Sequence, residues 1–283
     1  MSYNIKNILN HSSRLLRVAG IPKPLFEARL LLLHVTGITI QTQIGYPEKL
    51  VAKNDFIKLN NLLQRRCNYE PFAYIVGKKS FLEIEVAVNK YTLIPRPDSE
   101  VTVNSLKNII KDNKPKTILD LGTGSGVLLL SLLKSLPESY GIGVDISLPA
   151  LYVAKNNAIK LNLQHRSNFI CSNWADSLNK KKFDAVIANP PYIPSKEINK
   201  LSKEIAHYEP NKALDGGTDG MEKFLPLLKG IRNVAKEGAT ICIEIGQYQE
   251  LKVSSFMDSV GISNIKTNFD LNNKPRCLTG TFF

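Results

Sequence analysis

The 283-residue sequence is poor in the side chains that build metal centres and disulfide frameworks. Its four cysteines never form a Cys-x-x-Cys pair, and its four histidines are scattered along the chain. This spacing excludes the common zinc motifs and a disulfide-stapled secreted fold, so we expect no metal site and a reducing, cytoplasmic location. No apolar run approaches the roughly 18 residues that a transmembrane helix needs, so we expect no membrane partner.

Acidic residues are also scarce. The chain has 25 Asp and Glu against 37 Lys and Arg, which gives a formal net charge of +12 at pH 7. Residues 1–75 hold ten basic and four acidic residues, so half of the excess lies in this first segment. A positive field favours an acidic partner such as ribosomal RNA, but a lysine-rich solvated surface has the same composition. Charge alone leaves both interpretations open.

The length corresponds to about two average domains, and residues 1–75 have helical character. Residues 5–18 carry an apolar stripe at helical spacing, a second helix begins at Pro24, and a third covers residues 56–63. We therefore predict an N-terminal helical bundle domain over residues 1–75. The lack of any acidic residue before Glu27 is also typical of an organellar transit peptide, and composition does not decide between the two.

Residues 76–95 are predicted to form a β-hairpin linker. Residues 81–88 alternate between apolar and polar side chains, which is typical of a strand, and residues 91–94 form a second extended run. Pro97 then opens a helix for which Asp98 or Ser99 is the expected cap.

Beyond residue 115 strands and helices alternate, which predicts an α/β fold with an open parallel sheet covered by helices on both faces. The expected parallel strands are residues 117–121, 142–145, 168–171, 183–188 and 240–245. Two more strands, at residues 264–269 and 277–283, lie close in sequence and are expected to add an antiparallel edge. We predict that this second domain spans residues 96–283.

The first of these strands runs into a glycine-rich turn, Asp120-Leu-Gly-Thr-Gly-Ser-Gly126, and a helix follows at once. Glycines let the backbone turn sharply and approach a ligand closely. The spacing differs from the GxGxxG and P-loop motifs, and Asp120 would repel a pyrophosphate, so a cationic ligand such as S-adenosylmethionine fits better than NAD. Asp145, at the end of the next strand, is placed to accept hydrogen bonds from ribose hydroxyls.

A second motif, Asn189-Pro190-Pro191-Tyr192, ends the fourth predicted strand. Two prolines fix an extended backbone and remove two N–H donors, so the loop is rich in acceptors. The Asn189 side-chain oxygen and the Pro190 carbonyl are suited to accept both protons of a planar NH₂ group, on which Tyr192 would stack. Acceptors on both protons direct the nitrogen toward a sulfonium methyl and stabilise the developing charge. The motif therefore predicts methyl transfer to an amide or exocyclic amine without a metal.

Together, the Asp120–Gly126 turn, Asp145 and the Asn189–Tyr192 motif resemble the class I S-adenosylmethionine-dependent N-methyltransferases of the NPPY type, which share a Rossmann-like sheet. That group includes adenine methylases of nucleic acids and glutamine methylases of proteins. Four further segments are similar to the peptide chain release factor N(5)-glutamine methyltransferases: residues 70–77, 93–100, 208–220 and 244–247. The resemblance begins near residue 5, which favours a structural first helix over a transit peptide.

This resemblance implies methyl transfer to the glutamine of the Gly-Gly-Gln loop in bacterial-type release factors, with residues 1–75 as the docking domain. It implies catalytic roles for Asn189, Pro190 and Tyr192, and a substrate site that also includes Pro191 and Arg96. The cofactor site that it implies consists of Asp120, Gly122, Thr123, Gly124, Ser125, Gly126, Asp145, Asn173, Trp174 and Asn189. Asn173 stands where the family often has an acid, and its amide oxygen can still accept a hydrogen bond from the adenine amine.

Two other substrates stay open from the sequence, namely a glutamine of a large-subunit ribosomal protein and an exocyclic amine of RNA or DNA. The basic balance and the NPPY loop would suit a nucleic acid. No basic segment interleaved with aromatic side chains stands out, however, so we expect no stable nucleic-acid partner. A non-catalytic binding module would be expected to carry a broken motif, whereas both motifs are intact.

Overall fold

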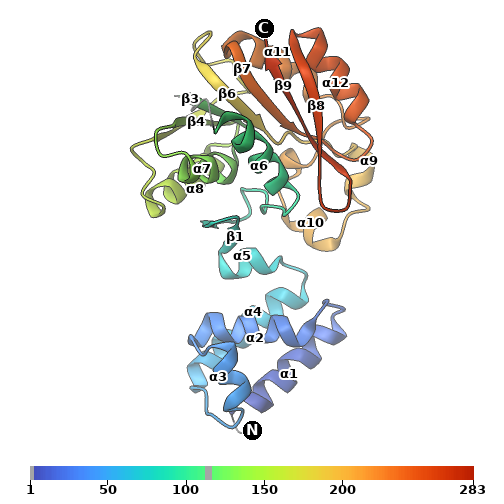
Figure 1. Ribbon diagram of the computed structural model, residues 1–283. Coiled ribbons are helices and arrows are strands. Elements are labelled where there is room, and N and C mark those ends of the chain that lie inside the picture. The colour runs from blue at the N-terminus through green and yellow to red at the C-terminus, as the bar shows by residue number, and fades with distance from the viewer. Residues whose placement is uncertain (1–2, 112–116) are drawn as a thin grey trace. The chain divides into compact units, whose positions relative to one another are not determined.

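The computed structural model describes residues 3–111 and 117–283, which group into two compact units (Figure 1). The helical unit consists of Met1–Gly77 together with Ser202–Tyr208, and the sheet unit consists of Lys78–Leu201 and Glu209–Phe283. The predicted ranges 1–75, 76–95 and 96–283 differ from this grouping in two respects. The hairpin belongs to the sheet unit, and a segment from deep in the second half of the chain belongs to the helical unit.

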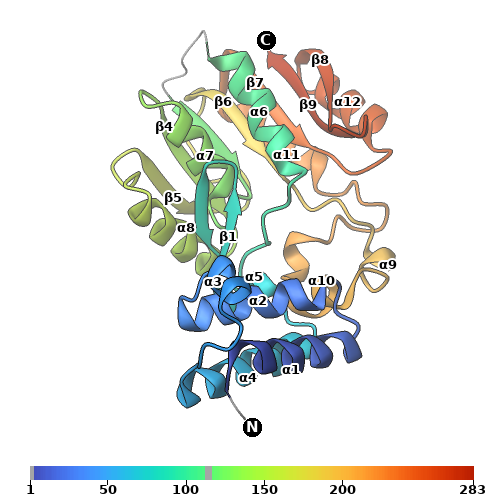
Figure 2. The ribbon, with the colours of Figure 1, turned by 60° about the horizontal axis from the view of Figure 1, so that its bottom comes forward.

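The helical unit is built from α1 (Ile5–Val18), α2 (Pro24–Thr36), α3 (Ile40–Gly45), α4 (Lys53–Cys67), α5 (Phe72–Val76) and α10 (Lys203–Tyr208). Helices α1, α2 and α4 pack against one another in a small bundle (Figure 2). Most of the stripe predicted for residues 5–18 is buried in its core, with Ile5 and Leu16 fully covered, but Val18 at its end is exposed. Local signals mark the ends: the Asn4 side chain caps α1, and Pro24 opens α2.

The sheet unit contains a seven-stranded sheet with the order β5-β4-β3-β6-β7-β9-β8. Its parallel part is formed by β3 (Thr117–Leu121), β4 (Tyr140–Asp145), β5 (Ser167–Cys171), β6 (Phe183–Ala188) and β7 (Ala235–Glu244). Strands β8 (Ile262–Phe269) and β9 (Pro275–Phe282) add the expected antiparallel edge, with β9 between β7 and β8. The α/β fold with a mainly parallel sheet is therefore confirmed, and the seven strands predicted beyond residue 115 are all present.

Helices cover both faces of this sheet. The remaining helices of the unit are α6 (Ser99–Ile110), α7 (Val127–Ser135), α8 (Leu148–Lys160), α9 (Ser195–Ile198), α11 (Phe224–Val234) and α12 (Glu250–Ser259), with a short 3-10 turn at Asn211–Ala213. Leu119 and Leu121 share one core cluster with apolar side chains of α11 and α12. A Cβ on Gly141, on the opposite face, would collide with Leu129 of α7. Helix α6 packs beside α7 and over β7.

The hairpin lies earlier than predicted. It pairs β1 (Lys78–Phe81) with β2 (Ile84–Ala87), and residues 91–94 are not a strand. The single strand predicted over residues 81–88 is wrong, because the chain turns at Leu82, whose backbone is left-handed (φ 47°). In the sequence Leu82 continues the apolar alternation of Ile84 and Val86 and so hides the turn, whereas in the structure Leu82 is exposed and Phe81, opposite Ile84, is buried.

Among the helices of the described residues, none combines the length and the apolar character that crossing a bilayer demands.

Candidate active site

The parallel register brings the predicted site residues to one edge of the sheet. Leu121 pairs with Ala188 and Val144, and Ala188 pairs in turn with Ile243. The glycine turn, Asp145, the NPPY loop and Glu244 therefore lie at or just beyond the carboxyl ends of four adjacent strands. This edge is where open α/β sheets bind their ligands.

The backbone conformation of the glycine turn explains why its glycines are there. Gly122, Gly124 and Gly126 all have positive φ, at 78°, 55° and 80°, which L side chains rarely adopt. Gly126 also begins α7, and a Cβ there would lie 3.2 Å from that of Ala154 in α8. The turn is therefore held close to the strand ends, and its own residues Thr123 and Ser125 are buried.

Asp120 is fully buried beside this turn. Its Oδ2 accepts a 2.7 Å hydrogen bond from the Thr123 hydroxyl, while its Oδ1 has no hydrogen-bond partner among the described residues. Burial raises the pKa of Asp120 to about 7, although the Thr123 hydroxyl lowers it. A buried carboxylate oxygen without a partner is an acceptor for a cationic or N–H-bearing ligand.

Asp145 closes the turn from the neighbouring strand. Its Oδ2 accepts from the Gly124 backbone N–H at 2.8 Å, and its Oδ1 accepts from Ser147 N–H at the same distance. Burial raises the pKa of Asp145, and these backbone donors oppose the shift. Each oxygen keeps a further lone pair, so the carboxylate can also accept from a ligand hydroxyl.

Trp174 lies against the same turn. A Cβ on Gly122 would be 3.6 Å from the Trp174 ring and 3.8 Å from the Asn189 backbone oxygen, so the three residues meet. The Trp174 backbone is left-handed (φ 46°), a conformation that bulky residues seldom adopt without a local reason. Asn173 beside it is exposed and donates to Asp176 at 3.1 Å, which leaves its amide oxygen available.

The NPPY loop is held by segments far away in sequence. Ile193 N–H donates to Leu214 O at 3.1 Å, and Gly216 N–H donates back to Ile193 O at 2.9 Å. Gln249 donates to Tyr192 O at 3.0 Å, and burial raises the pKa of the Tyr192 phenol well above its usual range. A Cβ on Gly216 would lie 2.8 Å from the Tyr192 carbonyl carbon, so this close approach requires a glycine at position 216.

Asn189 itself makes one side-chain hydrogen bond, in which Nδ2 donates to the Ser99 hydroxyl at 3.2 Å. The Thr102 hydroxyl donates to Glu244 Oε2 at 3.3 Å, and the Ser99 and Thr102 hydroxyls both lower the pKa of Glu244. Glu244 is 2 % exposed, and burial raises its pKa to about 7. No ion pair reaches it among the residues that the structure describes.

Arg96 lies apart from these contacts. It pairs with Glu209, a buried carboxylate that also accepts from Ile94 N–H at 3.0 Å. Asp98 occupies the N-cap position of α6 without capping it by its side chain, and instead pairs with Arg276 at 2.7 Å. Asp98 is thus the N-cap residue, one of the two expected, but its side chain makes no capping hydrogen bond because its carboxylate faces a guanidinium on β9. The role predicted for Arg96 in substrate binding stays a prediction.

Sequence reasoning missed Ser99, Glu244, Gln249 and Glu209 as parts of the site. Glu244 carried a usable signal, since it is an acid at the end of an otherwise apolar buried strand. Ser99 and Gln249 carried none, because their contacts join segments 90 and 57 residues apart. Within residues 3–111 and 117–283, no group of three or more His, Cys, Asp or Glu side chains is arranged to hold a metal ion.

Two family models match the chain. The model described as "PrmC N-terminal domain" covers residues 7–77, and "Methyltransferase small domain" covers residues 98–217.

Three curated relatives illustrate the similarity. The release factor glutamine methyltransferase of Caulobacter vibrioides is 37% identical over 265 residues, covering 94% of this chain and 92% of that protein. The protein of the same name from Agrobacterium fabrum is 36% identical over 93% of this chain and 92% of its own length. The bifunctional methyltransferase of Rickettsia prowazekii is 39% identical over 92% of this chain, which spans 54% of that longer protein.

Two solved structures share the fold at low identity. A ribosomal protein L11 methylase from Lactobacillus delbrueckii subsp. bulgaricus aligns with a TM-score of 0.50 and 16% identity, over 68% of this chain and 82% of that one. A methyltransferase from Pyrococcus furiosus aligns with a TM-score of 0.50 and 14% identity, over 72% and 91% of the two chains.

Proposed function

The chain belongs to the release factor glutamine methyltransferase family, and from this premise we propose that it methylates the side-chain amide nitrogen of a release factor glutamine. The glutamine is the one in the Gly-Gly-Gln loop, and S-adenosylmethionine is the methyl donor. Methylation of a glutamine in a large-subunit ribosomal protein, or of an exocyclic amine in RNA or DNA, is an alternative outcome that the test distinguishes.

The glycine turn fits S-adenosylmethionine on three counts. The unpartnered Oδ1 of Asp120 suits a donor that carries an ammonium group, and Asp145 keeps free lone pairs for ribose hydroxyls. The left-handed glycines leave the approach to the backbone clear, with Trp174 as a flat neighbour for a purine. When bound, this cosubstrate supplies an electrophilic methyl group on a sulfonium.

The chain's own residues then prepare the nitrogen. In this proposal, the Asn189 Oδ1 and the Pro190 carbonyl accept the two amide protons of the glutamine, while Tyr192 packs on the amide plane. Burial keeps the Tyr192 phenol neutral, so no negative charge forms beside the amide. Holding both protons stabilises the positive charge that develops on nitrogen during transfer. Orientation supplies the rest of the rate enhancement.

One observation carries the proposal: the loop that would hold the amide touches the loop that would hold the methyl donor. The Asn189 backbone oxygen lies 3.8 Å from the Cβ position of Gly122. A donor and an acceptor bound at these two loops would therefore be neighbours, as a direct transfer requires.

The substrate is tested with methyl-labelled S-adenosylmethionine. We expect label in release factor, and none in release factor whose Gly-Gly-Gln glutamine is replaced by alanine. Separate incubations contain ribosomal protein, tRNA and DNA. Label in one of these pools, together with an unlabelled release factor, would overturn the proposed substrate.

The site is tested with Asn189→Ala. Turnover should fall about 10²- to 10³-fold, since one stabilising group at the developing charge is lost. Trp174 is the only tryptophan in the sequence, so its fluorescence reports cofactor binding independently of turnover. We expect the cofactor titration to stay close to that of the wild type. Unchanged turnover would remove Asn189 from the mechanism.

Docking is proposed for residues 1–75, where half of the excess positive charge lies. Charge complementarity acts mainly on encounter rate. Raising the salt concentration should therefore increase KM for release factor and leave kcat nearly constant. A KM that is independent of salt would contradict this role of the charge.

A further inference from the structure

Asn189 and Glu244 are neighbours because of the strand register. Ala188 in β6 pairs with Ile243 in β7, and each of the two polar residues follows its strand partner by one position. Helix α6 packs over both strands and begins with Ser99, which is 3 % exposed. The side chains of Asn189, Glu244 and Ser99 therefore lie together where β6, β7 and α6 meet.

The protons of this group can be counted. A serine hydroxyl has one proton to donate, and an ionised carboxylate can only accept. The Ser99 oxygen accepts from Asn189 Nδ2 at 3.2 Å, so its own proton points away from that contact, and the carboxylate whose pKa the Ser99 hydroxyl lowers is Glu244. The Asn189 amide is then turned with Nδ2 toward Ser99, and its Oδ1 faces away from that contact. An amide turned by 180° would place two acceptors against each other.

We propose that Ser99 and Glu244 are positioning residues, which fix the Asn189 amide so that its oxygen, and not its NH₂ group, is presented to the methyl-accepting nitrogen. The inference rests on the proposed role of Asn189 as the acceptor for that nitrogen. Neither Ser99 nor Glu244 contacts the substrate in this arrangement. They act by excluding the amide orientation that would repel a substrate NH₂ group.

The charge on Glu244 decides how firmly the amide is fixed. A protonated Glu244 could donate to Ser99, which could then donate to the Asn189 oxygen and stabilise the wrong orientation. Burial raises the pKa of Glu244 to about 7, with the Ser99 and Thr102 hydroxyls opposing this shift. The charged and titratable groups that face Glu244 are Asp98, Arg276, Tyr192, Cys242 and Cys277.

The first experiment compares Ser99→Ala with Ser131→Ala. Both serines are 3 % exposed, but the Ser131 hydroxyl in α7 has no hydrogen-bond partner among the described residues. We expect kcat to fall about 10- to 100-fold in Ser99→Ala, the size typical of a lost orienting contact, and to stay at the wild-type value in Ser131→Ala. Cofactor affinity, followed by Trp174 fluorescence, should be equal in both. Ser99→Thr, which keeps the hydroxyl, should recover most of the lost kcat.

The second experiment measures kcat against pH at saturating cofactor. In the wild type, kcat should rise as the pH passes upward through the pKa of Glu244, because the ionised form enforces the productive amide. Glu244→Gln has no charge to lose, and its amide can donate to Ser99. This variant should show a low kcat without that rise.

The outcomes separate the two proposals. If Asn189→Ala keeps its turnover, the proposed function of the loop fails. If Asn189→Ala loses turnover while Ser99→Ala and Ser131→Ala both keep it, the positioning inference alone fails. The inference also fails if Glu244→Gln retains the wild-type pH profile. Thermal unfolding of each variant shows that the compared proteins are folded.

Discussion

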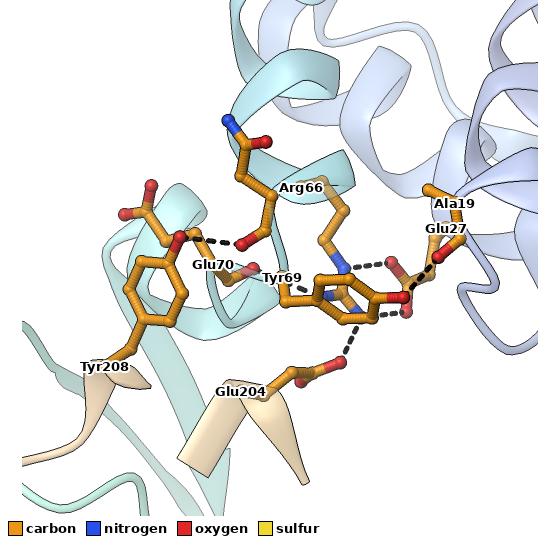
Figure 3. A network of polar contacts seen from close by, with 8 residues as sticks. Ala19, Glu27, Arg66, Tyr69, Glu70, Glu204 and Tyr208 are labelled. Atoms are coloured by element: carbon orange, nitrogen blue, oxygen red, sulfur yellow. Dashed lines mark hydrogen bonds and ion pairs between the residues drawn. The ribbon is translucent and has the colours of Figure 1, made fainter. Parts of the chain in front are cut away.

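The two units of the chain differ in how their buried charges are paired, because the sheet unit has one paired buried acid, Glu209 with Arg96, and also two unpaired ones. In the helical unit, Arg66 is 2 % exposed and binds Glu27 and Glu204, each at 2.6 Å, while also donating to Glu70 O (Figure 3). In the sheet unit, Asp120 and Glu244 are buried, and no cation pairs with either among the described residues. Buried charges normally have partners. The ion-pair network of Arg66 with Glu27 and Glu204, called the joint below, therefore indicates a structural role. Unpaired buried acids such as Asp120 and Glu244 are typical of a functional site.

The joint includes helix α10, which comes from a distant part of the chain. Glu204 lies in α10, and Tyr208 at the end of that helix donates to Asn68 O at 2.8 Å. The Lys203 ammonium lies over the Tyr69 ring at 4.6 Å from its centroid. Tyr69 also donates to Ala19 O (Figure 3). These contacts explain why Ser202–Tyr208 groups with the helical unit.

Removing the cation from the joint is expected to have the largest effect on stability. Arg66→Met would leave Glu27 and Glu204 facing each other without a counterion. We expect the free energy of unfolding of the helical unit to fall by about 4 kcal/mol, as for other broken buried ion pairs. Urea unfolding followed by circular dichroism measures this change. A loss below 1 kcal/mol would show that the joint is no more important than a surface pair.

The unpaired Asp120 of the sheet unit is expected to make the stability of the protein depend on pH. Its pKa of about 7 in the folded protein exceeds the ordinary 3.8, so the folded state binds the proton more tightly than the unfolded chain. The stability contributed by Asp120 is therefore full below pH 4 and is lost as the pH rises through 7. The wild type should lose about 4 kcal/mol relative to Asp120→Asn between pH 4 and 8. Parallel stability curves for the two proteins would contradict the unpaired state of this acid.

Removing one anion from the joint should have a smaller effect. Glu204→Gln leaves Arg66 paired with Glu27 and retains a hydrogen-bonding side chain, and Glu204 is already 32% exposed. We expect a loss of about 1 kcal/mol. Trypsin should cleave faster after Lys203, because α10 would open more often. Cleavage at the wild-type rate would mean that Tyr208 and Lys203 hold the segment without Glu204.

The neighbouring arginine is the matched control with the smallest expected effect. Arg65 pairs with Glu70 at 2.6 Å, but its side chain is 43% exposed. Arg65→Met should cost less than about 1 kcal/mol, and the cost should shrink further in high salt. If Arg65→Met and Arg66→Met were equally destabilising, burial would not distinguish the two pairs.

The sequence predicted the elements of the sheet unit well because their signals are local. Strands β3 and β6 have the predicted bounds, and the other five begin one to five residues earlier. The glycine turn and the NPPY loop lie at the ends of their strands as expected, since the motif and the strand are continuous in sequence. Their register then follows from the parallel topology.

What the sequence could not predict depends on contacts between distant segments. Helix α10 lies in a stretch that gives no sign of packing with residues more than 130 positions earlier. The support of Asn189 by Ser99 has the same origin. The turn at Leu82 was missed for another reason, since Leu82 continues the apolar alternation of Ile84 and Val86 in the sequence although it is exposed at the turn.

The return of the chain to the helical unit at Ser202–Tyr208 has a consequence for dissecting the molecule. The polypeptide passes from one unit to the other three times, after Gly77, after Leu201 and after Tyr208. No single cut therefore yields two complete fragments. A piece ending at Gly77 would lack Glu204 and Tyr208. A piece beginning at Lys78 would contain α10 without the helices with which it packs. Expression of separate halves calls for the α10 segment to be grafted onto the first and replaced by a short linker in the second.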